Sequence, residues 1–271
     1  MNIDFSKNIT LATCAFAVKP GEEHTMPYHF DAALNGGFEG FELSFICGGK
    51  AKDLLDAAKT AQVDICAVHG IMTANACVKD KTLRDKAFEE AYRYLDTFAE
   101  LAPCPIVEHY WSRYNDPDMG KYFLETVSRL LEKTEGYGFT FCMENAPYKP
   151  EINERYPDIK EVADFIKSFA GRMYMTFDVN HANLNEDVLY AVEAGSGLIR
   201  HIHVSDNHGH REEHLWPVEG IIDLKSVIDK IYKTDYNGPC NFECCFQKGY
   251  IADTKDYKRI YDYIVSNVVP Q

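Results

Sequence analysis

Short apolar runs alternate with longer amphipathic segments along the whole chain. The apolar runs are rich in β-branched and aromatic residues, and their length is typical of buried strands. Strands are therefore predicted at residues 8–16, 38–45, 63–69, 104–110, 139–144, 173–178, 198–205 and 239–246. Helices are predicted between them, at residues 22–34, 50–60, 80–101, 118–135, 158–170, 186–195, 223–233 and 254–268.

The segment 80–101 illustrates the helical pattern. Apolar residues recur every three or four positions, with charged residues between them, at Leu83, Ala87, Ala91 and Leu95. Glycines follow three of the predicted helices and are expected to be C-caps: Gly136, Gly171 and Gly195.

Repeated strand–helix units predict the fold class. Eight of them in a chain of 271 residues indicate a single-domain (β/α)8 TIM barrel over residues 1–271. The alternative is an open, doubly wound sheet. That fold usually carries a glycine-rich phosphate loop after an early strand, and the sequence has none.

Composition narrows the class of protein. The formal net charge is −14, which disfavours nucleic acid as a partner because affinity for phosphate depends on Lys and Arg. No segment approaches the roughly 18 apolar residues that a membrane helix needs, and the start MNIDFSKNIT does not resemble a signal peptide. The nine cysteines lack CxxC spacing and are expected to be reduced. We expect a cytoplasmic protein with a small-molecule substrate, either monomeric or homo-oligomeric.

Titratable side chains stand at the ends of six consecutive predicted strands. In strand order they are His69; Glu108 and His109; Glu144; Asp178, with His181 three residues later; His203; and Glu243. In a TIM barrel these ends meet at one mouth, where active sites lie. Carboxylates gathered there would repel one another and raise each other's pKa values, and a divalent cation would remove that repulsion. The pattern therefore predicts a metal site.

The residue types restrict which metal fits. Glu144, Asp178, His203 and Glu243 offer three carboxylates and one imidazole, a set suited to Mn²⁺, Zn²⁺, Mg²⁺ or Co²⁺. Further imidazoles would favour Zn²⁺, and each could instead support a ligand or contact the substrate: His69, His109, His181 and His214. His201 lies deeper on the strand of His203 and is expected to be a core histidine.

Five segments resemble the xylose-isomerase-like TIM-barrel superfamily. They are MEN (143–145), FDVNH (177–181), HIHVSDNHG (201–209), EEHLWPVEGIID (212–223) and NFE (241–243). The resemblance extends from GFEGFEL at 37–43 to the eighth strand. Members include isomerases and epimerases of sugars and sugar phosphates, and endonuclease IV.

The resemblance implies a metal-dependent isomerase or epimerase of a sugar or sugar phosphate. Glu144, Asp178, His203 and Glu243 would hold the metal, with Mn²⁺ or Zn²⁺ expected before Mg²⁺ or Co²⁺. Glu144 and Glu243 would also transfer protons through a metal-stabilised enediolate. The remaining residues predicted to contact the substrate are His181, His69, His109, Arg211 and Trp111. Aromatic residues such as Phe16, Trp111 and Trp216 would either stack on a sugar or pack loops over the mouth.

Endonuclease IV, a zinc phosphodiesterase with three metal ions, provides the alternative. Its additional ligands match His69, His109, His181 and His214, and its Asp-x-His pair falls on Glu212 and His214. The segments HGIMTAN and HYWSRYN do not follow that family's local pattern, and the acidic charge disfavours DNA. A sugar-binding barrel without catalytic activity is a third hypothesis.

Overall fold

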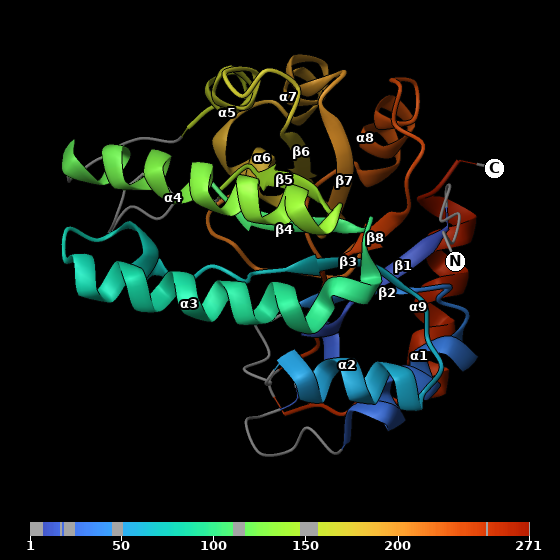
Figure 1. Cartoon of the computed structure of the whole chain (residues 1–271). Coiled ribbons are helices and arrows are strands. Elements are labelled where there is room, and N and C mark those ends of the chain that lie inside the picture. Colours follow the sequence, from blue (N-terminus) through green and yellow to red (C-terminus); the bar gives the residue numbers. More distant parts are fainter. Residues whose placement is uncertain are drawn as a thin grey trace.

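Eight parallel strands form a closed barrel at the centre of the molecule (Figure 1). The computed structural model describes residues 8–16, 18, 25–44, 51–110, 117–146, 157–247 and 249–270. Each strand pairs with the next in sequence, and β1 closes the barrel on β8. The strands are β1 Ile9–Ala12, β2 Phe41–Ser44, β3 Ile65–His69, β4 Pro105–His109, β5 Thr140–Glu144, β6 Tyr174–Asp178, β7 Ile199–Val204 and β8 Cys240–Phe242. The predicted TIM barrel is confirmed.

Helices surround the strands, with α3 beside α4 and α1 against α9 (Figure 1). The α-helices are α1 Met26–Gly36, α2 Ala51–Thr60, α3 Lys81–Phe98, α4 Pro117–Tyr137, α5 Ile159–Lys167, α6 Val179–Asn185, α7 Val188–Gly195, α8 Leu224–Ile231 and α9 Thr254–Asn267. Short 3-10 helices are η1 Thr13–Phe16, η4 Ala74–Cys77 and η5 Ala99–Leu101. Helix α6 was not predicted, because it follows β6 without a turn.

The predicted C-cap glycines are displaced from the helix ends. Gly136 lies inside α4, and Gly138 takes the left-handed conformation, with φ of 83°. Likewise Gly195 is the last residue of α7, and Gly197 has the positive φ. Gly171 does have a positive φ, but α5 ends before it, at Lys167. In each Gly-x-Gly pair the second glycine, not the first, provides the turn.

Strand register decides which side chains enter the barrel. His109 pairs with Glu144, and both face the interior because neighbouring residues across a ladder share a face. Glu108 precedes His109 and so faces the helices, where Oε1 accepts the backbone N–H of Met72 at 2.9 Å. Glu108 was counted among the metal-capable strand ends, and the structure corrects this: adjacent residues of a strand point to opposite sides.

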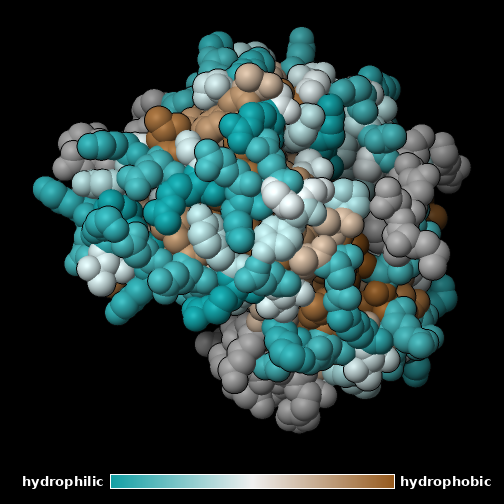
Figure 2. Space-filling view, in the orientation of Figure 1, coloured by the Kyte–Doolittle hydropathy of each residue, from teal (hydrophilic) through white to brown (hydrophobic). Residues whose placement is uncertain are grey.

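The remaining expectations concern the surface and the cysteines. Hydrophilic side chains cover most of the face in Figure 2, in keeping with the net charge of −14. Within the described segments, no helix combines the length and the apolar character needed to cross a membrane. Eight cysteines fall within these segments, and all of them are free thiols.

Candidate metal centre

The four predicted metal ligands meet at the carboxyl end of the barrel. One candidate ligand atom from each of Glu144, Asp178, His203 and Glu243 lies within 4.8 Å of all the others. Nδ1 of His203 is 2.9 Å from Oε1 of Glu144 and 3.2 Å from Oε2 of Glu243. The same nitrogen is 3.8 Å from Oδ2 of Asp178. All four side chains are buried.

Local hydrogen bonds hold Asp178 in place. Asn145, directly after β5, receives the backbone N–H of Asp178 at 2.8 Å and donates to its carbonyl at 2.9 Å. Oδ1 of Asp178 accepts the backbone N–H of His181 at 2.6 Å and so caps α6. Oδ2 is left to face the other ligands. The MEN and FDVNH segments are therefore joined by hydrogen bonds between the ends of β5 and β6.

A second group joins the first through a shared carboxylate. Nε2 of His69 and Nε2 of His109 lie 3.2 Å and 3.4 Å from Oε2 of Glu144. These three residues offer ligand atoms within 4.8 Å of one another. Glu144 thus belongs to two groups of candidate ligands.

A third group lies in the outer part of the mouth. Oε1 of Glu212 is 3.0 Å from Nε2 of His214 and 3.4 Å from Nε2 of His181. The three residues meet the same spacing as the other groups. All five predicted additional ligands, His69, His109, His181, Glu212 and His214, are therefore brought into groups of three.

Glu42 was not among the residues predicted from the sequence. This residue of β2 is fully buried, and its Oε2 lies 2.8 Å from Nε2 of His201 and 2.8 Å from Nε2 of His203. Glu42, His69 and His203 form a fourth group with metal-ligand spacing. The available signal was a lone carboxylate between Phe41 and Leu43 in an apolar strand. His201 is the buried core histidine that was expected.

The groups in the centre have strongly shifted pKa values. Burial opposes the charge on Glu144, but the surrounding imidazoles, His203 foremost, hold the pKa of this carboxyl well below its usual range. Burial and the neighbouring carboxylates raise the pKa of Asp178 to about 7. Burial disfavours protonation of His181 and His214, yet nearby carboxylates raise their pKa values to about 9 and about 10. Without a metal, protons on these side chains offset the negative charge of the carboxylates, and a bound dication would replace such protons.

Several buried ligand atoms have no hydrogen-bond partner. They are Oε2 of Glu144, Oδ2 of Asp178 and both carboxylate oxygens of Glu243. Leaving buried carboxylate oxygens without a partner is costly, and coordination of a cation would satisfy them. The donor set of oxygens and imidazole nitrogens fits a divalent cation.

Three side chains of the ligand groups keep some exposed surface. The side chains of His109, Glu212 and His214 are 26%, 25% and 17% exposed, so a small molecule could approach the buried ligands past them. Arg211 is not part of this group. Its side chain is 79% exposed and pairs with Glu213 at 3.2 Å, and its contact with a substrate stays a prediction. Trp111 lies outside the described residues.

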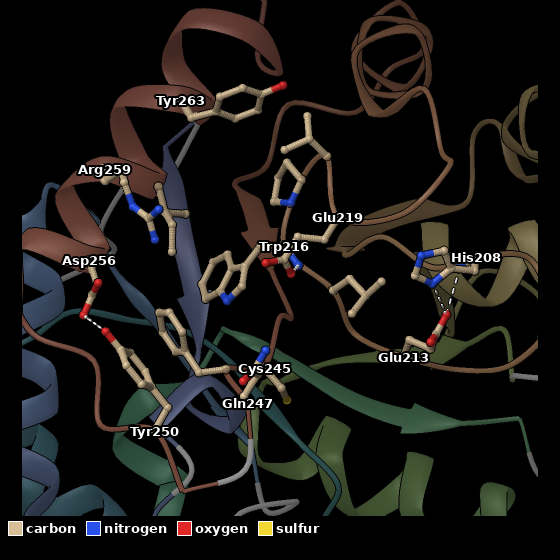
Figure 3. A pocket seen from close by; sticks show the side chains of 15 residues that line it. His208, Glu213, Trp216, Glu219, Cys245, Gln247, Tyr250, Asp256, Arg259 and Tyr263 are labelled. Carbon is tan, nitrogen blue, oxygen red and sulfur yellow. Dashed lines mark hydrogen bonds and ion pairs between the residues drawn. The ribbon is translucent and has the colours of Figure 1, made fainter.

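Two of the aromatic candidates are buried against other ring side chains. Phe16 is buried and stacks on His29, with ring centroids 5.3 Å apart. Trp216 is buried against Phe246, at 5.0 Å between centroids, and lines a cavity of about 970 Å³ beside α9 (Figure 3). The cavity lining contains none of the residues of the four ligand groups. Both positions agree with the packing role, and stacking on a sugar stays a prediction.

Comparison with known proteins places the chain in a family. The family model described as xylose isomerase-like TIM barrel matches residues 30–262. Uncharacterized protein MJ1311 of Methanocaldococcus jannaschii is 29% identical over 172 residues, which cover 62% of this chain and 55% of that protein. The match thus spans about half the length of this relative.

Solved structures share the whole barrel. A D-tagatose 3-epimerase-like protein has 20% identity and a TM-score of 0.73, with 96% of each chain covered. The D-psicose 3-epimerase from Clostridium cellulolyticum H10 has 16% identity and a TM-score of 0.75, covering 97% of this chain and 100% of that one. At such identities the likeness shows the fold. The match of the family model over residues 30–262 establishes that this chain belongs to the xylose isomerase-like TIM-barrel family.

Proposed function

We propose that the protein is a divalent-metal-dependent isomerase or epimerase of a sugar or sugar phosphate. The observation that carries this proposal is the buried group of Glu144, Asp178, His203 and Glu243, whose ligand atoms lie within 4.8 Å of one another. The names of similar structures, a D-tagatose 3-epimerase-like protein and a D-psicose 3-epimerase, support a sugar as the substrate. Mn²⁺ and Zn²⁺ are the cations that best suit these ligands.

Two glutamates are available for proton transfer. A bound dication would polarise the carbonyl of an open-chain sugar, which makes the adjacent C–H acidic. Glu144 and Glu243 project from β5 and from the end of β8, and each has at least one buried oxygen without a hydrogen bond. One carboxylate would take the proton from carbon and the other would return a proton to a different carbon or face. His181, beside Asp178, would hold a substrate oxygen.

A second function is favoured by a specific observation. The groups His69–His109–Glu144 and His181–Glu212–His214 have the spacing of two further metal sites. A centre with several metal ions would suit hydrolysis of a phosphate ester, as in endonuclease IV. The net charge of −14 disfavours DNA as its substrate. We therefore rank phosphodiester hydrolysis second.

Exchange of a carbon-bound proton separates these functions. The protein, loaded with Mn²⁺ or Zn²⁺, is incubated with ketoses and their phosphates in D₂O, and deuterium at the stereocentre is measured by NMR. We expect incorporation with the wild type and a large loss in Glu243→Gln. Elemental analysis of the same samples counts the metals. Three ions per chain, with cleavage of a phosphodiester and no deuterium incorporation, would instead support the second function.

A further inference from the structure

Glu42 lies directly beneath the proposed metal group. Register places it inside the barrel, paired with Ala12 of β1 on one side and Ala67 of β3 on the other. Its side chain has no exposed surface. A buried carboxylate in a barrel interior is costly unless its partners repay the loss of hydration, so its contacts should explain why it is there.

Glu42 contacts His203, a proposed metal ligand, at the ring nitrogen that points away from the other ligands. Nε2 of His203 lies 2.8 Å from Oε2 of Glu42. The other ring nitrogen, Nδ1, faces Glu144 at 2.9 Å and Glu243 at 3.2 Å. The imidazole therefore has Glu42 on one edge and the candidate metal-binding oxygens on the other.

We infer that Glu42 is a positioning residue that accepts the Nε2–H of His203 and so directs the unprotonated Nδ1 toward the metal group. This inference rests on the proposed metal centre. Hydrogen bonds of this kind orient the imidazole, select its tautomer and raise its basicity as a ligand. Oε1 of Glu42 also lies 3.5 Å from Nδ1 of His69, a longer contact that adds negative charge beneath the second group.

The surroundings of Glu42 support this role. Nε2 of His203 and Nε2 of His201 both lie 2.8 Å from Oε2, and Nδ1 of His69 lies 3.5 Å from Oε1. An ionised acceptor makes a stronger hydrogen bond than a neutral one. The alternative is that Glu42, His69 and His203 bind a cation themselves. In that case Nε2 of His203 would be a ligand and would carry no proton, so the protonation of this nitrogen distinguishes the two roles.

Metal affinity in graded variants tests the inference. Glu42→Gln keeps the shape and an acceptor oxygen but removes the charge, whereas Glu42→Leu removes the acceptor. We expect Zn²⁺ affinity, measured by competition with a chromophoric chelator, to fall about 10- to 100-fold in Glu42→Gln and further in Glu42→Leu. The matched control is His201→Gln, which alters the other partner of Oε2 and should bind Zn²⁺ about as tightly as the wild type.

The tautomer provides a readout that a purely structural role would not change. Long-range ¹H–¹⁵N spectra of Zn²⁺-loaded wild type, labelled in histidine, should show a proton on Nε2 of His203. A proton on Nδ1, or on neither nitrogen, would overturn the inference even if the variants fail to fold. Wild-type affinity in Glu42→Gln would overturn it as well. Absence of Zn²⁺ binding in the wild type would refute the proposed metal centre itself, and the inference with it.

Discussion

On three neighbouring strands, a side chain without charge lies two positions before a carboxylate or an imidazole. The pairs are Ala67 and His69 on β3, Val107 and His109 on β4, and Cys142 and Glu144 on β5. The neutral members pack with Cys66 in a small apolar cluster inside the barrel. The carboxylate and imidazole members all belong to candidate ligand groups.

On β3, β4 and β5, the two ends of the interior are therefore stabilised differently. Burying apolar side chains at the amino end is favourable in itself. Burying carboxylates at the carboxyl end is costly, and only imidazolium groups or a cation can compensate for it. A step of two residues along a strand moves a position from the part that stabilises the barrel to the part that we expect to act on a substrate.

The largest effect is expected from Glu144→Gln. Glu144 is shared by two ligand groups, so the variant should bind less metal, and deuterium incorporation should fall on the order of 10³-fold. Cys142→Ala is the matched control, one layer deeper on the same strand face. It should retain its metal and lose about 1 kcal/mol of unfolding free energy. If Cys142→Ala lost as much metal as Glu144→Gln, the division between the two ends would be wrong.

Glu108 extends the comparison to the outer face of β4. Burial raises its pKa to about 8, above the value of about 4.3 in an unfolded chain. Its contribution to stability is then fully present below pH 4.3 and is lost as the pH rises through 8, by at most about 5 kcal/mol. We expect the unfolding free energy of metal-free wild type to decline from pH 5 to pH 8 more steeply than that of Glu108→Gln. The exposed Glu132→Gln on α4 serves as control, and equal slopes in all three proteins would contradict the prediction.

The fold was predictable because a parallel barrel repeats one simple pattern. Apolar strands and amphipathic helices alternate, and the strands end in titratable residues. Element ends were less predictable: the predicted strand 8–16 stops at Ala12, where Thr13–Phe16 turn into a 3-10 helix. Such ends depend on tertiary contacts that the local pattern does not contain.

The site was predictable where a residue ends a strand and faces inward. Glu144, Asp178 and Glu243 meet as expected, since all strands run in one direction. Glu108 was counted and Glu42 was missed because the local pattern does not show which of the two alternating faces of a strand points into the barrel. Arg211 lies in a loop, where spacing along the sequence does not determine direction.

The affinity for metal should also change with pH, by a smaller factor than the loss of deuterium incorporation expected for Glu144→Gln. Asp178 is protonated below about pH 7, and His181 and His214 keep their protons up to about pH 9 and about pH 10. A cation held by Glu144, Asp178, His203 and Glu243 must displace the proton of Asp178, so its affinity should rise about tenfold per pH unit up to about pH 7. A cation in the group of His181, Glu212 and His214 would also displace the two imidazole protons. Calorimetric titration with Zn²⁺ in two buffers of different ionisation enthalpy counts the protons. Equal heats in both buffers would show that none is released.

The smallest effect is expected at the amino end, from Thr10→Val. Oγ1 of Thr10 donates to Oδ1 of Asn241 at 2.9 Å in the buried interior, and valine has the same shape without the donor. The variant should lose about 1–2 kcal/mol of unfolding free energy, seen as a shift in the denaturant midpoint. Asn241 is also the ladder partner of His203. The variant therefore tests whether a change in packing at the amino end alters metal binding at the carboxyl end. If they are independent, Zn²⁺ affinity will not change. A loss of affinity here would mean that packing at the amino end sets the position of His203, and that the boundary between the two ends lies deeper in the barrel.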